Sequence, residues 1–216
     1  EMYRHETKIK QHKNVTHYTY GRYGSTTTIE LENILKELEK AYHVFLTGTG
    51  FGGIALALMS LCRPGDEIIV SDNVYGPTKE ISEKLLKEFD INAKFYDPNS
   101  FDDLKDKITK KTKIILVENP GSNTFEFQDL SKIISLAKRK KILTLLDNTW
   151  GTPFYLKPLE IGFDMSFSSA TKYFSGHSDA MGGSLAVNKK VFKKIMFFYK
   201  LSGYRMSADE AYLIIR

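Results

Sequence analysis

The sequence predicts an α/β protein in which a mainly parallel sheet is covered by helices on both faces. Strand-like apolar runs alternate with helix-like patterns along the chain, which is typical of this class. No long Pro/Gly-rich linker and no internal repeat interrupts the alternation. With 216 residues, of which 42% are hydrophobic, the chain can bury one sizeable core without disulfides or a metal.

The first predicted element is a helix near the amino end. Thr27 and Glu30 resemble a capping box, in which two side chains satisfy the first free amides of a helix. Apolar residues then recur at helical spacing, at Leu31, Ile34, Leu35 and Leu38.

Strands are predicted from short runs rich in β-branched and aromatic residues, with helix patterns between most of them. One charged run, Lys138 to Lys141, is interpreted as a solvated helix end. The strand candidates are Val44 to Leu46, Glu67 to Val70, Ala93 to Tyr96, Lys113 to Val117, Ile142 to Leu146, Met165 to Ser168 and Ser184 to Val187.

Composition and charge bear on partners and location. The net charge of +5 comes from 31 basic and 26 acidic residues, but the lysines are scattered, so we do not expect nucleic acid as a partner. No apolar run approaches the roughly 20 residues of a membrane helix, and the charged segment Glu1 to Asn14 lacks the apolar centre of a secretory signal. The lone Cys62 lies in an apolar stretch, which indicates a core residue. We expect a cytoplasmic protein.

Two residues carry the strongest chemical signal. Lys172 lies in Ser169-Ala170-Thr171-Lys172-Tyr173, and Asp147 closes the apolar run Ile142 to Leu146, at the carboxyl end of a predicted buried strand. Taken alone, the lysine would be a surface group and the aspartate a turn or cap residue. Together they suggest pyridoxal phosphate chemistry, because the aldehyde of that cofactor needs an amine and its ring nitrogen needs a carboxylate to stay protonated.

The sequence around these residues resembles a known family. Asp147-Asn148-Thr149-Trp150, Ser169 to Tyr173 and Gly176-His177-Ser178-Asp179 are similar in order and spacing to the transsulfuration, or Cys/Met metabolism, family of pyridoxal phosphate enzymes. Although His177, Ser178 and Asp179 are triad residue types, consecutive residues cannot converge as a triad does. The resemblance implies the large domain of the fold type I, aspartate aminotransferase-like, pyridoxal-phosphate-dependent transferases.

The same resemblance implies further site residues. It assigns Lys172, Tyr75 and Asp147 to catalysis, with the Tyr75 ring stacked on the cofactor. It assigns Tyr20 and Arg22 to the cofactor phosphate of a neighbouring subunit, for which the planar fork of arginine is suited. The other cofactor-binding residues that it implies are Gly50 and Phe51 in a phosphate-cradling turn, Ser169 and Thr171 as phosphate donors, and Asn119 in the loop Glu118 to Ser122.

A second interpretation competes for the glycine-rich turn. Gly48 to Gly53 satisfies G-x-G-x-x-G, follows an apolar run, and has Asp72 about 20 residues further on, as in a dinucleotide-binding site. That interpretation would leave Lys172, Asp147 and Arg22 without a role. We therefore favour pyridoxal phosphate over NAD.

The resemblance also implies an organisation and an activity. Residues 1–25 would form an arm on a neighbouring subunit, 26–200 the cofactor-binding large domain, and 201–216 the start of a helix leading to a small carboxyl-terminal domain that is missing here. The local sequence is most similar to bacterial cystathionine β-lyases, so we expect cleavage of L-cystathionine into homocysteine, pyruvate and ammonia by a homo-oligomer, a dimer or tetramer. A related γ-lyase or γ-synthase, or a truncated cofactor-binding remnant without turnover, are the alternatives.

Overall fold

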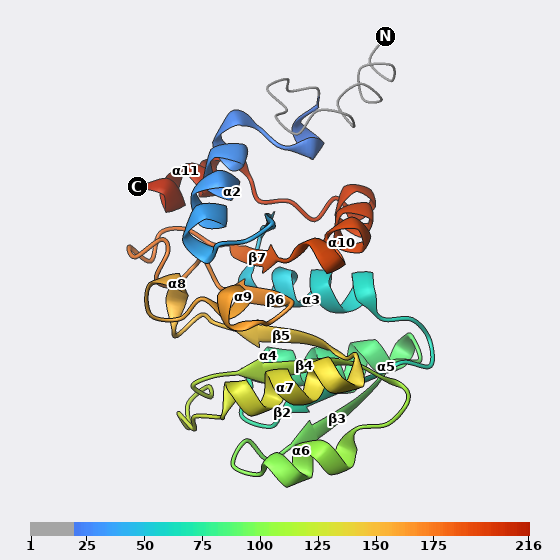
Figure 1. Ribbon diagram of the computed structural model, residues 1–216. Coiled ribbons are helices and arrows are strands. Elements are labelled where there is room, and N and C mark those ends of the chain that lie inside the picture. Colours follow the sequence, from blue (N-terminus) through green and yellow to red (C-terminus); the bar gives the residue numbers. More distant parts are fainter. Residues whose placement is uncertain (1–19) are drawn as a thin grey trace.

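A seven-stranded sheet forms the centre of the computed structural model, which describes residues 20–216 (Figure 1). The strand order is β1-β7-β6-β5-β4-β2-β3, and every pairing is parallel except the two made by β7. The strands are β1 (His43–Thr47), β2 (Glu67–Ser71), β3 (Asn92–Tyr96), β4 (Thr112–Glu118), β5 (Leu143–Asp147), β6 (Met165–Ser168) and β7 (Gly183–Val187). The predicted fold class and all the strand candidates are confirmed.

Helices cover both faces of this sheet. On one face lie α3 and α10, and on the other lie α6 and α7, with α2 and α11 over β1 and β7 (Figure 1). The helical elements are η1 (Gly21–Tyr23), α2 (Thr26–Glu39), α3 (Gly50–Leu61), α4 (Gly76–Glu80), η2 (Ile81–Leu85), α5 (Leu86–Glu88), α6 (Phe101–Lys107), α7 (Leu130–Lys140), α8 (Thr152–Tyr155), α9 (Pro158–Ile161), α10 (Lys189–Ser202) and α11 (Ala208–Ile215).

The central strands are continuously apolar because both of their faces are buried. In β4, Ile114 and Leu116 pack into the core under α3, whereas Ile115 and Val117 pack into the core under α7. A strand covered on one face only would alternate apolar and polar residues. Cys62 lies in the first of these cores, where burial raises the pKa of its thiol to about 12, so its interpretation as a core residue is confirmed.

The predicted amino-terminal cap of the first helix is wrong by two residues. Ser25 is the cap: its hydroxyl accepts a hydrogen bond from the amide of Thr28 at 3.2 Å, and its own amide donates to the Thr28 hydroxyl at 2.8 Å. Thr27 lies inside the helix. Ser25 takes the cap because its backbone is extended, which a cap residue requires. Of the predicted apolar stripe, Leu31 and Leu35 are buried, while Ile34 and Leu38 lie on the exposed flank.

The two ends of the chain bear on the predicted organisation. Residues 1–19 of the predicted arm lie outside the described residues. The segment 201–216 holds the end of α10, a turn, and α11, whose Ala211 and Ile214 pack against Leu31 and Leu35 of α2. The division into an arm, a large domain and a connecting helix stays a prediction.

Residues 20–216 contain neither a membrane-spanning helix nor a cluster of metal-binding side chains. No helix there combines the length and apolar character that crossing a membrane requires. No group of three or more His, Cys, Asp or Glu side chains there is placed to hold a metal ion.

Glu39 is a buried acid at the carboxyl end of α2. It is 1% exposed at the end of α2, and neither carboxyl oxygen has a hydrogen-bond partner. The Ser166 hydroxyl lies near the Glu39 carboxyl but does not form a hydrogen bond with it. Its effect is to favour the ionised form of Glu39. Burial dominates and raises the pKa of Glu39 from 4.5 to about 7.

Glu39→Gln is expected to stabilise the protein at high pH. Folded wild-type chains keep the Glu39 proton at pH values where unfolded chains have lost it, so their stability falls as pH rises from 4.5 to about 7. Above that range the variant is expected to be more stable, by a difference on the order of 3 kcal/mol at most. Urea unfolding at pH 5 and pH 8 measures this. Glu37→Gln, on the exposed face of the same helix, is the control, and equal stability of wild type and Glu39→Gln at pH 8 would contradict the prediction.

Candidate functional site

The candidate site lies where the parallel strands end. Because β1, β2, β4, β5 and β6 run in the same direction, their carboxyl ends meet at one edge of the sheet. This is the edge at which open α/β sheets bind ligands. The segments that follow these strands carry Gly50, Tyr75, Asn119, Asp147 and the turn from Ser169 to Lys172.

Asp147 is a buried carboxyl at the end of β5. It is 6% exposed, and its Oδ1 accepts a hydrogen bond from the amide of Thr149 at 3.0 Å. Burial raises its pKa to about 6, against the opposing effect of Thr149. No lysine or arginine among residues 20–216 forms an ion pair with it. A buried carboxylate without a cation is costly unless a bound group supplies the charge.

Glu118 is a site residue that the sequence prediction missed. It ends β4 directly beside Asp147 of β5, and its Oε2 accepts a hydrogen bond from the amide of Tyr75 at 2.7 Å. Burial, and then the neighbouring Asp147, raise the pKa of Glu118 to about 8. The available signal was its place at the end of the predicted strand Lys113 to Val117, in line with Asp147.

The turn at Gly50 lies against the turn at Ser169. A side chain at Gly50 would place its Cβ 2.5 Å from the Ser169 hydroxyl oxygen, so this close approach requires glycine. Thr49 caps α3 by accepting a hydrogen bond from the Gly52 amide at 3.0 Å. The result is a helix amino terminus beside a hydroxyl, an arrangement suited to phosphate. The neighbouring Phe51 is partly exposed.

A hydrogen bond ties the lysine turn to the end of β5. The amide of Ser169 donates to the Thr149 hydroxyl at 2.9 Å, which links the segment after β6 to the segment that holds Asp147. Lys172 follows in an exposed turn, and its amine has no hydrogen bond or ion pair with the described part of the chain. Thr171 bonds Gly182, donating to its carbonyl at 3.2 Å and accepting from its amide at 3.0 Å. The phosphate role of Thr171 stays a prediction.

Tyr75 and Asn119 differ in how free their side chains are. Tyr75 is 52% exposed, and its main chain is held by Glu118 and by the first turn of α4, so its ring stands free at the strand ends. Asn119 is buried, and its Oδ1 accepts a hydrogen bond from the amide of Gln128 at 2.6 Å. Asn119 therefore holds its own loop, and its role at the cofactor stays a prediction.

Tyr20 and Arg22 lie apart from these residues in the same chain. Arg22 donates to the carbonyl of Lys200 at 2.5 Å and to the Tyr23 hydroxyl at 3.1 Å. The Tyr20 ring is largely exposed. Among the described residues, neither forms a hydrogen bond or ion pair with Asp147 or Ser169, and their assignment to the site of a neighbouring subunit remains a prediction.

The strand order excludes the dinucleotide interpretation of Gly48 to Gly53. That motif requires the strand before the turn to pair with the strand after the helix. Here β1 and β2 are separated by four strands. Asp72, the proposed ribose ligand, instead forms an ion pair with Lys79 of α4.

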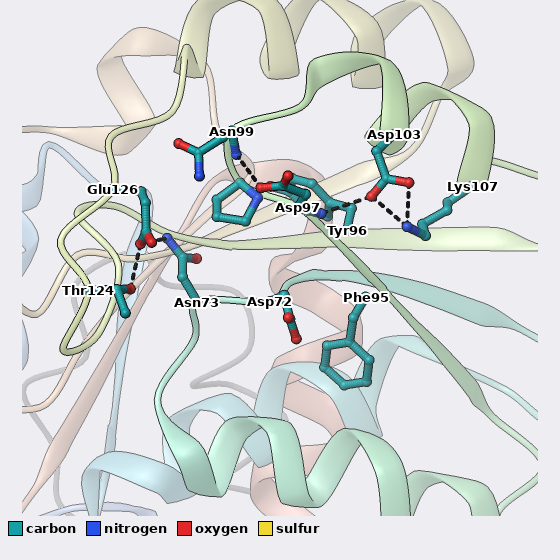
Figure 2. Close-up of a pocket in the computed structure, with 11 residues that line it drawn as sticks. Asp72, Asn73, Phe95, Tyr96, Asp97, Asn99, Asp103, Lys107, Thr124 and Glu126 are labelled. Atoms are coloured by element: carbon teal, nitrogen blue, oxygen red, sulfur yellow. Dashed lines mark hydrogen bonds and ion pairs between the residues drawn. The ribbon is translucent and has the colours of Figure 1, made fainter.

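A cavity of about 500 Å³ opens beside β2 and β3, and Figure 2 shows the residues that line it. None of the residues predicted to bind the cofactor lines it. Its charged groups are largely satisfied by one another: Glu126 accepts from Asn73 and Thr124, and Asp103 pairs with Lys107. We assign it no ligand.

Comparison with known proteins identifies the family. The sequence profile described as "Cys/Met metabolism PLP-dependent enzyme" matches residues 2–216. The chain belongs to this family. Its members depend on pyridoxal phosphate (PLP), which confirms the family predicted from the sequence.

The similar proteins carry different reaction names. A cystathionine beta-lyase of Bordetella avium is 36% identical over 199 residues, covering 92% of this chain and 50% of that protein. An L-alanine/L-glutamate racemase of Wolbachia pipientis wMel is 33% identical over 199 residues, with 92% and 49% covered. The crystal structure of cystathionine gamma synthase from Xanthomonas oryzae pv. oryzae, in complex with aminoacrylate and cysteine, superposes with a TM-score of 0.89 at 31% identity, covering 94% of this chain and 53% of that one. The chain spans about half the length of the curated relatives it matches.

The residues at the strand ends fit this cofactor. Asp147 is a buried carboxyl without a cation, as a pyridinium partner should be. The close approach of Gly50 to Ser169 leaves backbone amides and a hydroxyl for a phosphate, and Lys172 offers an amine on the same edge. In the bound protein these three parts would hold the ring nitrogen, the phosphate and the aldehyde of pyridoxal phosphate, respectively.

Gly50→Ala is expected to destabilise the protein by about 1–3 kcal/mol, because the added methyl group overlaps Ser169. Urea unfolding measures the loss. Gly76→Ala is the matched control, since a Cβ at Gly76 meets nothing within 4 Å, and its effect should stay below about 1 kcal/mol. Similar effects of the two substitutions would show that the turn at Gly50 is not tightly packed.

Proposed function

We propose that this chain binds pyridoxal phosphate through Lys172 and acts in carbon–sulfur bond cleavage of a sulfur amino acid, by β-elimination from L-cystathionine. The observation that carries the proposal is the buried Asp147, without a cation, on the same edge as the amine of Lys172 and the glycine turn at Gly50. The family membership supports the choice of cofactor.

Each residue has a definite task in this proposal. Lys172 holds the aldehyde carbon of the cofactor and then moves the proton from the α-carbon of the substrate. Asp147 keeps the proton on the ring nitrogen, and Tyr75 covers a face of the ring. Ser169 and the amides after Gly50 hold the phosphate. When bound, the cofactor ring supplies the sink for the electron pair that the α-proton leaves behind.

The β-elimination reaction breaks the bond between Cβ and sulfur. Removal of the α-proton provides the electron pair that forms the new carbon–carbon double bond, while the thiolate leaves and takes up a proton as homocysteine. Addition of water to the remaining three-carbon fragment gives pyruvate and ammonia. The thiol, the keto acid and ammonia together account for all the atoms of cystathionine and one water.

The preference for β-elimination rests on local sequence. Asp147-Asn148-Thr149-Trp150, and Pro120-Gly121-Ser122 with Thr124, are most similar to bacterial cystathionine β-lyases, and the B. avium relative carries that name. A γ-synthase and a racemase share the scaffold, because all of these reactions depend on control of the proton on the α-carbon. We also propose that the enzyme is a cytoplasmic homo-oligomer, in which Tyr20 and Arg22 complete the site of a neighbour.

Cofactor binding without turnover is the second candidate function. The positions of the arginines favour it. Arginine is the usual partner of a substrate carboxylate. The side chains of four arginines in the described part of the chain are engaged elsewhere: Arg22 and Arg63 donate to main-chain carbonyls, and Arg205 and Arg216 pair with acids. Arg139 lies at the end of α7.

Borohydride reduction of the PLP-loaded protein is expected to place a pyridoxyl mass on the peptide that contains Lys172. Peptide mass spectrometry reads this without any turnover. Lys172→Ala should abolish the label, whereas Lys157→Ala, at a partly exposed loop lysine, should leave it in place. A label on a different lysine of the wild-type protein would refute the assignment of Lys172.

Incubation with L-cystathionine is expected to yield pyruvate and homocysteine, the products of β-elimination. A γ-elimination would instead yield 2-oxobutyrate and cysteine, and a racemase would convert L-alanine to its D-form. We expect slow turnover by the 216-residue chain and faster turnover by a fusion to the carboxyl-terminal half of the B. avium relative, which would supply a carboxylate-binding group. Predominant 2-oxobutyrate from the fusion would contradict β-elimination, and label at Lys172 without turnover by either protein would support the second candidate.

A further inference from the structure

We propose that Glu118 is a positioning residue of this site: it fixes the main chain of Tyr75 and shares a single proton with Asp147, so that the two carboxyls present one negative charge to the cofactor ring. The proposal rests on the proposed function in that the ring is that of pyridoxal phosphate. Its geometric part concerns the protein alone.

Sheet register brings the two carboxyls together. Glu118 and Asp147 end neighbouring parallel strands and are direct partners in the pairing of β4 with β5. Their side chains point to the face covered by α3, because Leu116 and Leu145, two residues earlier on each strand, pack into the core on that face. The two acids are therefore side by side at the edge where the ligand is proposed to bind.

The hydrogen bond to Tyr75 connects this pair to the ring-stacking residue. Glu118 Oε2 lies 2.7 Å from the amide nitrogen of Tyr75, while the Tyr75 carbonyl accepts from the amide of Thr78 at 2.8 Å. The amide of Val74 donates to the carbonyl of Ser71, so the turn between β2 and α4 is held on both sides of Tyr75. The exposed ring is thus carried on a main chain that Glu118 fixes.

The surroundings favour a state in which only one of the two carboxyls, Glu118 or Asp147, is ionised. Asp147 is buried and Glu118 is half-buried, so two ionised carboxyls side by side here would repel each other, and neither one forms an ion pair within residues 20–216. The nearby charged groups on other elements are committed elsewhere: Lys79 of α4 pairs with Asp72, and Glu126 accepts from Asn73 and Thr124.

The proton belongs on Glu118 at neutral pH. Burial and the neighbouring Asp147 raise the pKa of Glu118 to about 8, above the value of about 6 for Asp147. Asp147 then stays ionised, as a pyridinium partner must. A pair of acids whose environments separate their pKa values is a common way to assign one neutral and one charged role.

Two substitutions of Glu118 distinguish its role as hydrogen-bond acceptor for the Tyr75 amide from its role as a carboxyl group. Glu118→Leu removes the acceptor for the Tyr75 amide and is expected to weaken PLP binding about tenfold. Glu118→Gln keeps a neutral acceptor of the same shape and should recover most of that affinity. Glu126→Leu, on the loop that follows β4 and in contact with Asn73 instead of Tyr75, is the control and should change affinity less than about twofold. Fluorescence titration with PLP at pH 7 gives the dissociation constants. If Glu118→Leu binds as wild type does, or if Glu118→Gln binds as weakly as Glu118→Leu, the proposal fails.

Two measurements on the cofactor-free protein keep this test independent of the proposed function. Hydrogen exchange at the Tyr75 amide should be faster in Glu118→Leu than in wild type or Glu118→Gln. The infrared difference spectrum between wild type and Glu118→Gln at pH 7 should contain the band of a protonated carboxyl group. The bands of the buried acids Glu32 and Glu39 are present in both proteins, so the subtraction removes them. Absence of that band, or unchanged exchange, overturns the role of Glu118. Failure of wild type to carry PLP on Lys172, with both signals present, overturns the proposed function alone.

Discussion

The parallel pairing of β4, β5 and β6 is the constraint on which the rest of the site depends. It brings three strand ends into line, so that Glu118, Asp147 and Ser169 arrive at the same edge from segments far apart in the sequence. The Thr149–Ser169 hydrogen bond then fixes the separation of the last two segments. Without this register, the chemistry-bearing residues would be ordinary polar groups at the ends of strands.

Burial gives these residues their chemical character. An exposed aspartate would be ionised and well solvated, and it would gain little from a cation. At Asp147 solvent is nearly excluded, so a positive ring nitrogen is attracted strongly and an unpaired charge is costly. The same burial, applied to two neighbouring acids, separates their protonation states. The sheet thus supplies both the position and the electrostatic environment of the site.

The sequence predicted the fold and named candidate site residues, but it did not predict how the residues at the strand ends are joined. The strands were predictable because β-branched and aliphatic runs such as Ile114 to Val117 are buried on both faces, which leaves a continuous apolar signal. Asp147 and Lys172 were named from local motifs, and the structure places Asp147 and the lysine turn at the same edge of the sheet, while their roles stay predictions. Glu118 was missed because its importance comes from register with β5, which a linear pattern does not encode. The dinucleotide motif was ambiguous for a similar reason, since strand order is a property of the folded sheet. The helix cap at Ser25 was missed because neighbouring Ser and Thr residues compete for that position.

The reversal of β7 has a consequence for how this site can change over time. Because β7 runs against β6, the chain returns to the same edge after the lysine turn, and Ser168 faces Ser184 at the base of the excursion. The bonds between Thr171 and Gly182 close that base directly before Lys172. Lys172 is therefore the first residue of the loop 172–181, called the lobe here, whose two ends are joined by these bonds. Substitutions or insertions in the lobe would change the surface beside the strand ends without removing the Thr171–Gly182 bonds that anchor the main chain before Lys172. Variation of reaction on a constant scaffold is what such an arrangement permits.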